Sequence, residues 1–294
     1  MNLLPWAYTT SAQITLRGWH STPSGKPVLH FLHGNGFCGR VYEPMLERLS
    51  ADFDLWLCDI QGHGDSDAGT HFLGWNRNAE LAVEAFQAQS QMFASVPVYA
   101  AAHSLGGVLT SLIMAQHPQL FKRTVLLDPV IFTPALQMFI KTCERLGVTG
   151  FNKLAKRTAV RRMHWPDRQT AYASLTGRGA FKDWAPEALT AFVDHALRPA
   201  EQGGVQLKCA PQLEATIFSS AANGLWRALR QVQTPVLMLY GTQTFPFVIK
   251  SAALWQQRNR YLRTEQVTGG HCFIQQDPAT AAQRVRTFLL SATC

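Results

Sequence analysis

The stretch Val98–Leu109 constrains the fold of this chain more than any other part of the sequence. It reads VYAAAHSLGGVL, an apolar strand, a turn of small residues and the start of an apolar helix predicted to reach about Gln116. The turn AHSLG (102–106) is close to the nucleophile-elbow pattern G-x-S-x-G, in which a sharp strand-to-helix turn exposes a serine above a sheet. The residues two before and two after that serine must be small, because backbone passes close to both, and Ala102 keeps the first of them small. Ser104 is therefore a candidate nucleophile, with a helix N-terminus beneath the reacting centre.

Two other interpretations of this stretch need no catalysis. It could be a buried strand–helix junction in which a small hydroxyl happens to fit, since short motifs also match by accident. It could also be a membrane span, because residues 97–116 carry no formal charge. His103, Ser104 and two glycines at its middle exclude the span, so we expect no transmembrane segment.

Strand and helix patterns alternate on both sides of this stretch. Strands are predicted at 12–19, 27–32, 55–58, 123–127, 235–241 and 263–267, and helices at 42–49, 79–93, 248–258 and after Asp277-Pro278. Such alternation implies an α/β fold with a mostly parallel sheet and right-handed crossovers.

The alternation stops between Ile131 and Gln233, where the pattern is helical. Helices are predicted there at 135–146, 151–163, 167–175 and 186–197. An insertion between two sheet strands is placed to lie over the carboxyl ends of the strands, where ligands bind. We therefore expect residues 1–130 and 235–294 to form the core and residues 131–234 to form a helical cap.

Three further motifs accompany the Ser104 turn in a fixed order. They are His33-Gly34-Asn35-Gly36, Asp59-x-x-Gly62-His63-Gly64-x-Ser66 and Gly269-Gly270-His271. With them, the chain resembles the α/β-hydrolase family over nearly its whole length outside the insertion. The resemblance implies a sheet flanked by helices on both sides and an active serine at position 104.

The resemblance also implies roles for other residues. His271 lies on a late loop after the last predicted strand, where the family places its base. Leu105 supplies one oxyanion N–H by its position after the nucleophile, and the resemblance places the second at Asn35. The other motif histidines, at positions 33, 63 and 103, are expected to hold backbone in place.

The acid of the site departs from the commonest family pattern. The usual aspartate position, three residues past the glycine that ends the strand after the insertion, is occupied by Thr244. A threonine cannot stabilise an imidazolium as a carboxylate does, so replacing Thr244 with alanine is expected to do almost nothing. Asp128, at the end of the preceding strand, is the natural substitute, and some relatives, including one group of haloalkane dehalogenases, carry the acid there. Those enzymes use an aspartate nucleophile, whereas this chain has Ser104; the alternative for Asp128 is a turn or capping residue before Pro129.

These residues predict a serine hydrolase acting through an acyl-enzyme, with Ser104, His271 and Asp128 as catalytic residues. The expected substrate is a small-molecule carboxylic ester with an apolar body, and no cofactor, metal or nucleic acid is expected. Thioester cleavage, carbon–carbon hydrolysis and acyl transfer use the same groups and stay open. So does a non-catalytic ligand-binding protein of the same fold, in which Thr244 marks a decayed site. The sequence does not specify the physiological substrate or the oligomeric state.

Composition indicates the cellular compartment and shows an uneven distribution of charge. The six cysteines are scattered without a metal-type cluster, and residues 1–20 do not resemble a secretion signal, so we expect a cytoplasmic protein. Of the formal charge of +8, residues 131–200 contribute +6, from eleven Lys and Arg against five Asp and Glu. Five basic residues recur at helical spacing and are expected to share a solvent-facing side, which could attract anionic substrates or touch an anionic membrane surface, although a plain solvated face is favoured. They are Lys153, Lys156, Arg157, Arg161 and Arg162.

Overall fold

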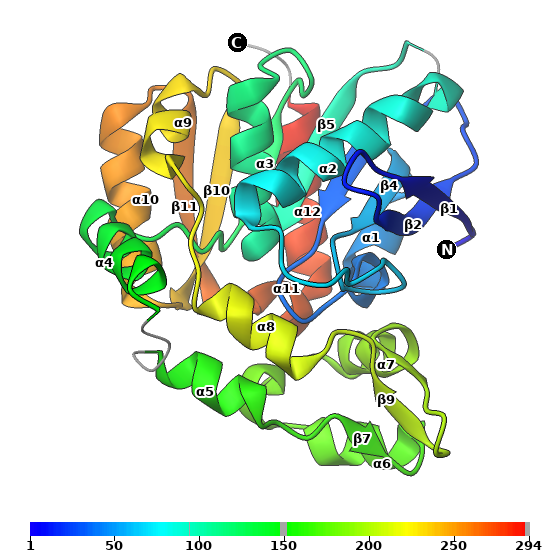
Figure 1. Cartoon of the computed structure of the whole chain (residues 1–294). Helices are drawn as coiled ribbons and strands as arrows, with labels where there is room; N and C mark the ends of the chain where they lie inside the picture. The colour runs from blue at the N-terminus through cyan, green and yellow to red at the C-terminus, as the bar shows by residue number, and fades with distance from the viewer. Residues whose placement is uncertain (94, 148–151, 292–294) are drawn as a thin grey trace.

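The computed structural model describes residues 1–93, 95–147 and 152–291 of the chain (Figure 1). Within these ranges an eight-stranded sheet has the order β1-β2-β4-β3-β5-β6-β10-β11. The strands are β1 (Leu3–Thr9), β2 (Thr15–Ser21), β3 (Val28–Leu32), β4 (Asp54–Asp59), β5 (Val98–His103), β6 (Thr124–Leu127), β10 (Val236–Gln243) and β11 (Leu262–Gly270). The β1–β2 and β2–β4 pairs are antiparallel and the remaining pairs are parallel. The prediction of a mostly parallel α/β sheet is confirmed.

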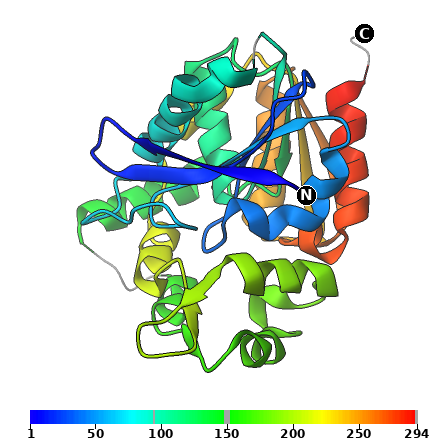
Figure 2. The same ribbon diagram turned by 90° about the vertical axis from the view of Figure 1, so that its right-hand side faces the viewer.

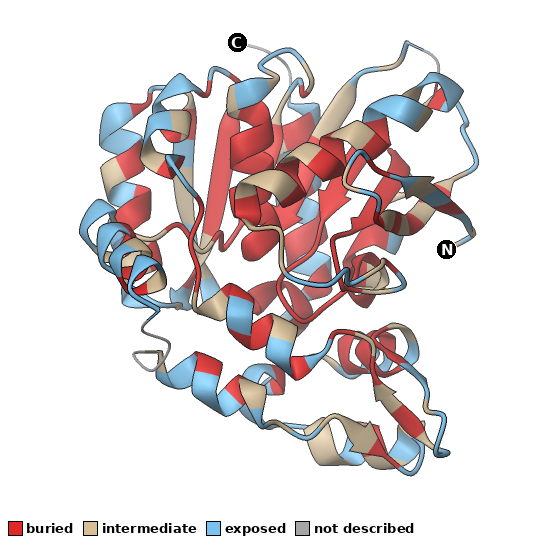
Figure 3. Ribbon diagram, viewed as in Figure 1, coloured by how far each residue is buried: buried red, intermediate tan, exposed pale blue. Residues whose placement is uncertain are grey.

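Helices cover both faces of this sheet (Figures 1 and 2). One face carries α2 (Trp75–Gln89), α3 (Leu105–Gln116), α9 (Leu225–Gln231) and α10 (Pro246–Arg258), and the other carries α1 (Glu43–Leu49) and α12 (Pro278–Leu290). Short helical turns at η1 (Gly39–Tyr42), η2 (Ser90–Phe93) and α11 (Phe273–Gln276) complete the core. Side chains of β3 alternate between the two layers: Val28 and Leu32 pack with the first set of helices, Leu29 and Phe31 with the second. Central strands buried on both faces read as continuous apolar runs, and the burial pattern shows this (Figure 3).

The N-terminal strands differ from the prediction of a single strand over 12–19. The structure has a β1–β2 hairpin, and Gln13, with a φ of 58°, lies in its turn. Strand β1 is an edge strand with mostly exposed side chains and a proline, so it lacks the apolar signal of the inner strands. One buried side chain, Trp6, ties it to the core by donating a hydrogen bond from Nε1 to the carbonyl of Leu57 at 3.1 Å.

The insertion, residues 131–234, contains short strands in addition to the helices that its pattern predicted. Its helices are α4 (Pro134–Arg145), α5 (Lys153–Ala159), α6 (Arg168–Leu175), η3 (Gly179–Phe181), α7 (Pro186–His195), α8 (Pro211–Phe218) and α9. A small antiparallel sheet with the order β7-β9-β8 joins them, formed by β7 (His164–Trp165), β8 (Leu197–Pro199) and β9 (Val205–Leu207). Strands of two or three residues are too short to produce a period-2 pattern, so the purely helical prediction was wrong there.

The part of the insertion from α5 to α8 lies across one end of the main sheet, close to α11 (Figures 1 and 2). The backbone N–H of Ala185 donates to the carbonyl of Gln275 at 2.9 Å, which ties this part to the core. Helix α5 is shorter than the predicted helix at 151–163, and its predicted first residue, Phe151, lies outside the described residues.

Two further findings concern the chain as a whole. In the described ranges, none of the helices combines the length and the apolar character needed to cross a membrane. Cys38, Cys58, Cys143, Cys209 and Cys272 are buried and free, and Cys294 lies outside the described residues.

Candidate active site

Ser104 occupies a strained turn between β5 and α3. Its φ of 54° and ψ of −116° are rare for a residue with a side chain, and neighbouring backbone holds it there. Its N–H donates to Leu127 at 3.0 Å, and its carbonyl accepts from Gly107 at 3.1 Å. A Cβ on Gly106 would lie 2.4 Å from the carbonyl oxygen of Leu32, so only glycine fits two residues after the serine. The glycine of the motif is therefore required by the close approach of β3.

Three side chains from distant parts of the sequence meet at this turn. The hydroxyl Oγ of Ser104 lies 2.9 Å from Nε2 of His271, which follows β11. The other ring nitrogen, Nδ1, lies 2.8 Å from Oδ1 of Asp128, which follows β6 and is fully buried. The His271 side chain is 22% exposed, so the hydroxyl–imidazole pair is the part of this arrangement that a ligand can reach.

Asp128 is surrounded by hydrogen-bond donors. The backbone N–H of Gly241 donates to Oδ2 at 2.8 Å, and the hydroxyl of Thr244 donates to Oδ1. A buried carboxylate is tolerated only when such donors satisfy it. The expectation for Thr244 did not include this hydrogen bond: Thr244 stands where the commonest family pattern has the acid, and its hydroxyl contacts the carboxylate of Asp128. The missed signal is a hydroxyl placed three residues after Gly241, directly after the strand next to the one that Asp128 follows.

The two predicted oxyanion donors have free amides. Among the described residues, the N–H groups of Asn35 and Leu105 donate no hydrogen bond, whereas the flanking N–H groups of Gly34, Gly36 and Gly106 all do. The loop lies close to the serine, since a Cβ on Gly34 would be 3.2 Å from that of Ser104. The Asn35 side chain instead contacts the insertion, donating to the carbonyl of Glu214 at 3.0 Å.

The other motif histidines hold backbone. His33 accepts the N–H of Ile60 at Nε2, 3.1 Å away, and His63 accepts that of Gly36 at 3.0 Å. Burial lowers the pKa of His33 to about 3 and that of His63 to about 4, so both are neutral near pH 7. Burial also lowers the pKa of His103 well below its usual value, with a contribution from nearby His271.

A buried hydrogen-bond chain links the loop of Asn35 to the loop of His271. The N–H of Gly34 donates to the hydroxyl of Tyr42 at 3.0 Å, and that hydroxyl contacts Nδ1 of His103 at 2.6 Å. The opposite ring nitrogen, Nε2, contacts the carbonyl of His271 at 3.0 Å. When the Tyr42 hydroxyl and the Nε2 of His103 act as donors, every polar group in this series of hydrogen bonds has a partner. No motif pointed to Tyr42, which lies outside all four.

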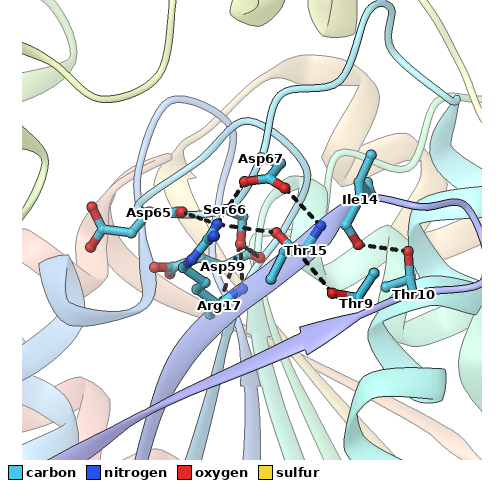
Figure 4. Close-up of polar contacts among 9 residues, drawn as sticks. All are labelled: Thr9, Thr10, Ile14, Thr15, Arg17, Asp59, Asp65, Ser66 and Asp67. Atoms are coloured by element: carbon cyan, nitrogen blue, oxygen red, sulfur yellow. Dashed lines mark hydrogen bonds and ion pairs between the residues drawn. The ribbon is translucent and has the colours of Figure 1, made fainter.

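The motif loop after β4 is fastened to β2 (Figure 4). The hydroxyl of Ser66 donates to the carbonyl of Asp59 at 2.6 Å and accepts from the N–H of Arg17 at 2.7 Å. The guanidinium of Arg17 also reaches Asp67 at 2.7 Å, and Asp67 accepts the N–H of Thr15 at 2.9 Å. These contacts explain the serine of the second motif as a structural residue that positions the loop carrying His63.

A cavity of about 820 Å³ opens between the insertion and the core, with His271 in its wall. Trp165, Phe181, Phe192, Phe218 and Phe245 line much of it.

The basic residues of the insertion do not form one solvent-facing side. Helix α5 ends at Ala159, so Arg161 and Arg162 lie beyond it and do not follow its helical spacing. Both line the cavity together with Arg157. Lys153 and Lys156 are exposed and do not line it.

The chemistry open to this site is that of an activated hydroxyl. No group of three or more His, Cys, Asp or Glu side chains that could hold a metal ion occurs in the described part of the chain. A hydroxyl, an imidazole and a buried carboxylate in series, beside two free amides, can carry out nucleophilic attack at a carbonyl.

Similarity to known proteins agrees with this fold. Residues 31–284 match the model of the Alpha/beta hydrolase family, and the chain belongs to that family. It is similar in sequence to several hydrolases and shares the fold of a solved hydrolase structure.

Three relatives illustrate the similarity. Mouse monoglyceride lipase is 28% identical over 121 residues, 39% of each chain, so the chain matches about two fifths of that relative's length. The 2-(acetamidomethylene)succinate hydrolase of Mesorhizobium japonicum is 25% identical over 228 residues, 78% of this chain and 74% of that one. A crystal structure of E-2-(acetamidomethylene)succinate hydrolase superposes with a TM-score of 0.77 and 22% identity, covering 99% of this chain and 100% of the other, a likeness of fold.

Proposed function

We propose that this protein is a serine hydrolase of carboxylic esters, in which Ser104, His271 and Asp128 form the catalytic triad. The observation that carries the proposal is the pair of contacts at His271, 2.9 Å to the Ser104 hydroxyl and 2.8 Å to the Asp128 carboxylate. Similarity to hydrolases, among them a monoglyceride lipase, supports an ester as the substrate.

In the acylation step, Ser104 Oγ attacks the ester carbonyl while His271 Nε2 accepts its proton. The negative charge that develops on the carbonyl oxygen is stabilised by the N–H groups of Asn35 and Leu105 and by the positive end of α3. Asp128 holds the imidazole with its proton on Nδ1 and stabilises the imidazolium. The ester C–O bond then breaks, and His271 returns the proton to the departing alcohol.

In the deacylation step, water attacks the acyl-serine. His271 Nε2 takes one proton from that water and passes it to Ser104 Oγ as the acyl C–O bond breaks. The carboxylic acid leaves and the hydroxyl of Ser104 is restored. The proposed cycle consumes one ester and one water and needs no cofactor.

The insertion, residues 131–234, would serve as the cap of this site. Its aromatic residues supply an apolar wall to the cavity, which favours substrates with an aliphatic or aromatic body. The buried free cysteines suit a reducing compartment, and on that ground we place the protein in the cytoplasm.

Labelling with a fluorophosphonate tests the proposal without knowledge of the substrate, because the reagent reports an activated serine. We expect labelling of the native protein, hydrolysis of 4-nitrophenyl esters, and loss of both in Ser104→Ala. The matched control is Ser111→Ala, the same change within α3, at a hydroxyl that donates to the carbonyl of Gly107. Unlabelled native protein would favour a non-catalytic binding protein, and persistent labelling of Ser104→Ala would place the nucleophile elsewhere.

A further inference from the structure

The charges around the cavity are strongly biased toward cations. Five of its lining residues are cationic, and two, Glu214 and Asp183, are acidic. The cations are Arg157, Arg161, Arg162, Arg178 and Lys182. In the described part of the chain a single ion pair forms among these groups, between Arg161 and Glu214. A cavity with such an excess of cations attracts an anionic ligand.

Arg161 is the least exposed of these cations. Its side chain is 26% exposed, whereas Arg157, Arg178 and Lys182 are exposed residues around it. Its Nη2 lies 2.6 Å from Glu214 Oε2 without hydrogen-bond alignment, and Nε has no acceptor although both nitrogens are shielded from water. Glu214 is thus the ion-pair partner of Nη2, and a ligand would meet the exposed part of the Arg161 side chain, to which Nε and Nη2 do not contribute.

Glu214 connects Arg161 to the reacting centre. A Cβ on Gly36 would lie 2.7 Å from its carboxyl, and the side chain of Asn35 donates to its carbonyl. The guanidinium therefore lies next to the loop that supplies an oxyanion amide, on the insertion side of the cavity. Burial raises the pKa of Glu214 to about 7, against the opposing effect of Arg161, so this carboxyl is a weak counter-ion near neutral pH.

We propose that Arg161 binds a carboxylate of the substrate, at a position remote from the ester carbonyl that Ser104 attacks. This inference rests on the proposed esterase function and specifies its substrate class as esters of dicarboxylic acids with one free carboxylate. A carboxylate suits the site because a guanidinium forms charge-assisted hydrogen bonds with carboxylate oxygens. Arg157, Arg178 and Lys182 raise the local concentration of such anions, and the aromatic wall accommodates the carbon chain between the two ends.

The test compares two esters that differ only in the remote charge. Mono-4-nitrophenyl glutarate carries the terminal carboxylate, and 4-nitrophenyl pentanoate has an acyl chain of the same length without it; a series from four to eight carbons covers different spans. Native protein should prefer the charged ester at one or more lengths. Arg161→Gln should lower kcat/KM for that ester by about 10- to 100-fold, mainly through KM, and change the neutral ester less than about twofold.

Controls separate this subsite from other effects. Lys153→Gln makes the same change at an exposed cation of α5 that does not line the cavity, and both esters should react as with native protein. Arg161→Lys keeps the charge but not the planar guanidinium, so its kcat/KM for the charged ester should lie between those of the native protein and Arg161→Gln. Should Arg161→Gln be unstable, the double variant Arg161→Gln, Glu214→Gln takes the place of the single variant in the comparison, because it leaves no unpaired carboxyl.

Each outcome decides one question. Equal losses for charged and neutral esters in Arg161→Gln, or no preference for the charged ester at any length, would overturn the carboxylate subsite while the neutral ester still reports the esterase. Turnover of neither ester, with no fluorophosphonate labelling, would overturn the proposed function itself. Should the serine label without ester turnover, glutarate is tested for slowing the labelling; protection lost in Arg161→Gln supports the subsite, and no protection in native protein contradicts it.

Discussion

At the scale of single residues, Asp128 determines whether the imidazole at the site has the correct orientation and tautomer. Asp128→Asn keeps the shape of the side chain but presents an amide to Nδ1 of His271, 2.8 Å away in the native protein. We expect kcat to fall by up to about 10⁴-fold with little change in KM. Steady-state kinetics on a neutral 4-nitrophenyl ester measures this, and an unaltered kcat would exclude Asp128 as the acid.

Thr244 donates to Oδ1 of the same carboxylate, whereas the backbone N–H of Gly241 donates to Oδ2. Thr244→Ala removes a hydrogen bond to a buried charged group, worth about 1.5–3 kcal/mol, so kcat and the free energy of unfolding should both decrease. We expect kcat to fall by about tenfold. Thr244→Ser keeps the hydroxyl and is the control, expected to be close to native; equal behaviour of the alanine and serine variants would show that the hydroxyl contributes nothing.

At the scale of elements, the Tyr42 hydroxyl joins the loop after β3 to His103 at the end of β5, and the His103 ring in turn contacts the loop after β11. Tyr42→Phe leaves the N–H of Gly34 without its acceptor and Nδ1 of His103 without its donor, in a fully buried position. We expect kcat to decrease by about tenfold with KM nearly unchanged. The loops that carry Asn35 and His271 would no longer be held in position relative to each other, while the substrate cavity stays intact.

The matched control for this change is Tyr8→Phe, which removes a hydroxyl that contacts Glu84 at 3.3 Å, away from the active site. It should leave kcat and KM as in the native protein. A Tyr42→Phe variant that loses thermal stability but keeps its native kcat would mean that the chain through His103 is structural only, without a positioning role.

At the scale of the whole molecule, buried carboxyls make stability depend on pH. Burial raises the pKa of Glu214 to about 7, above the ordinary value of 4.5 that applies in the unfolded chain. The folded state therefore holds this proton more tightly, so the stabilisation is fully present below about pH 4.5 and is lost as pH rises through about 7. At about 1.4 kcal/mol per unit of pKa, the loss is of order 3 kcal/mol.

Glu214→Gln should remove that part of the pH dependence. The free energy of unfolding, measured by urea denaturation from pH 5 to pH 8, should decrease less in the variant than in the native protein. Some decrease should persist, because burial also raises the pKa of Asp59 to about 7. Glu187→Gln, at an exposed carboxyl of α7, should follow the native curve; a Glu214→Gln curve parallel to the native one would contradict the assignment.

The sequence by itself determined the parts of this protein that depend on local backbone geometry. The turn at Ser104 is one, since Gly106 must be glycine where β3 passes within 2.4 Å of its Cβ position, and such a requirement is written directly into the motif. The alternation of buried strands and helices is another, because strands covered on both faces read as continuous apolar runs. These local features sufficed to predict the fold class and the family, and to place Ser104, His271 and Asp128 at the ends of their strands.

Only the tertiary structure decided which distant side chains meet. The contact of Thr244 with Asp128, the chain through Tyr42 and the place of Arg161 in the cavity join residues far apart in sequence, and a hydroxyl or a guanidinium carries no periodic signal of its partner. Strand β1 and the three short strands of the insertion were not predicted for a related reason. An exposed edge strand and segments of two or three residues are stabilised by their neighbours rather than by their own apolar pattern. Local sequence determines backbone conformation and burial, whereas the partners of polar side chains are determined by how distant segments pack together in the folded protein.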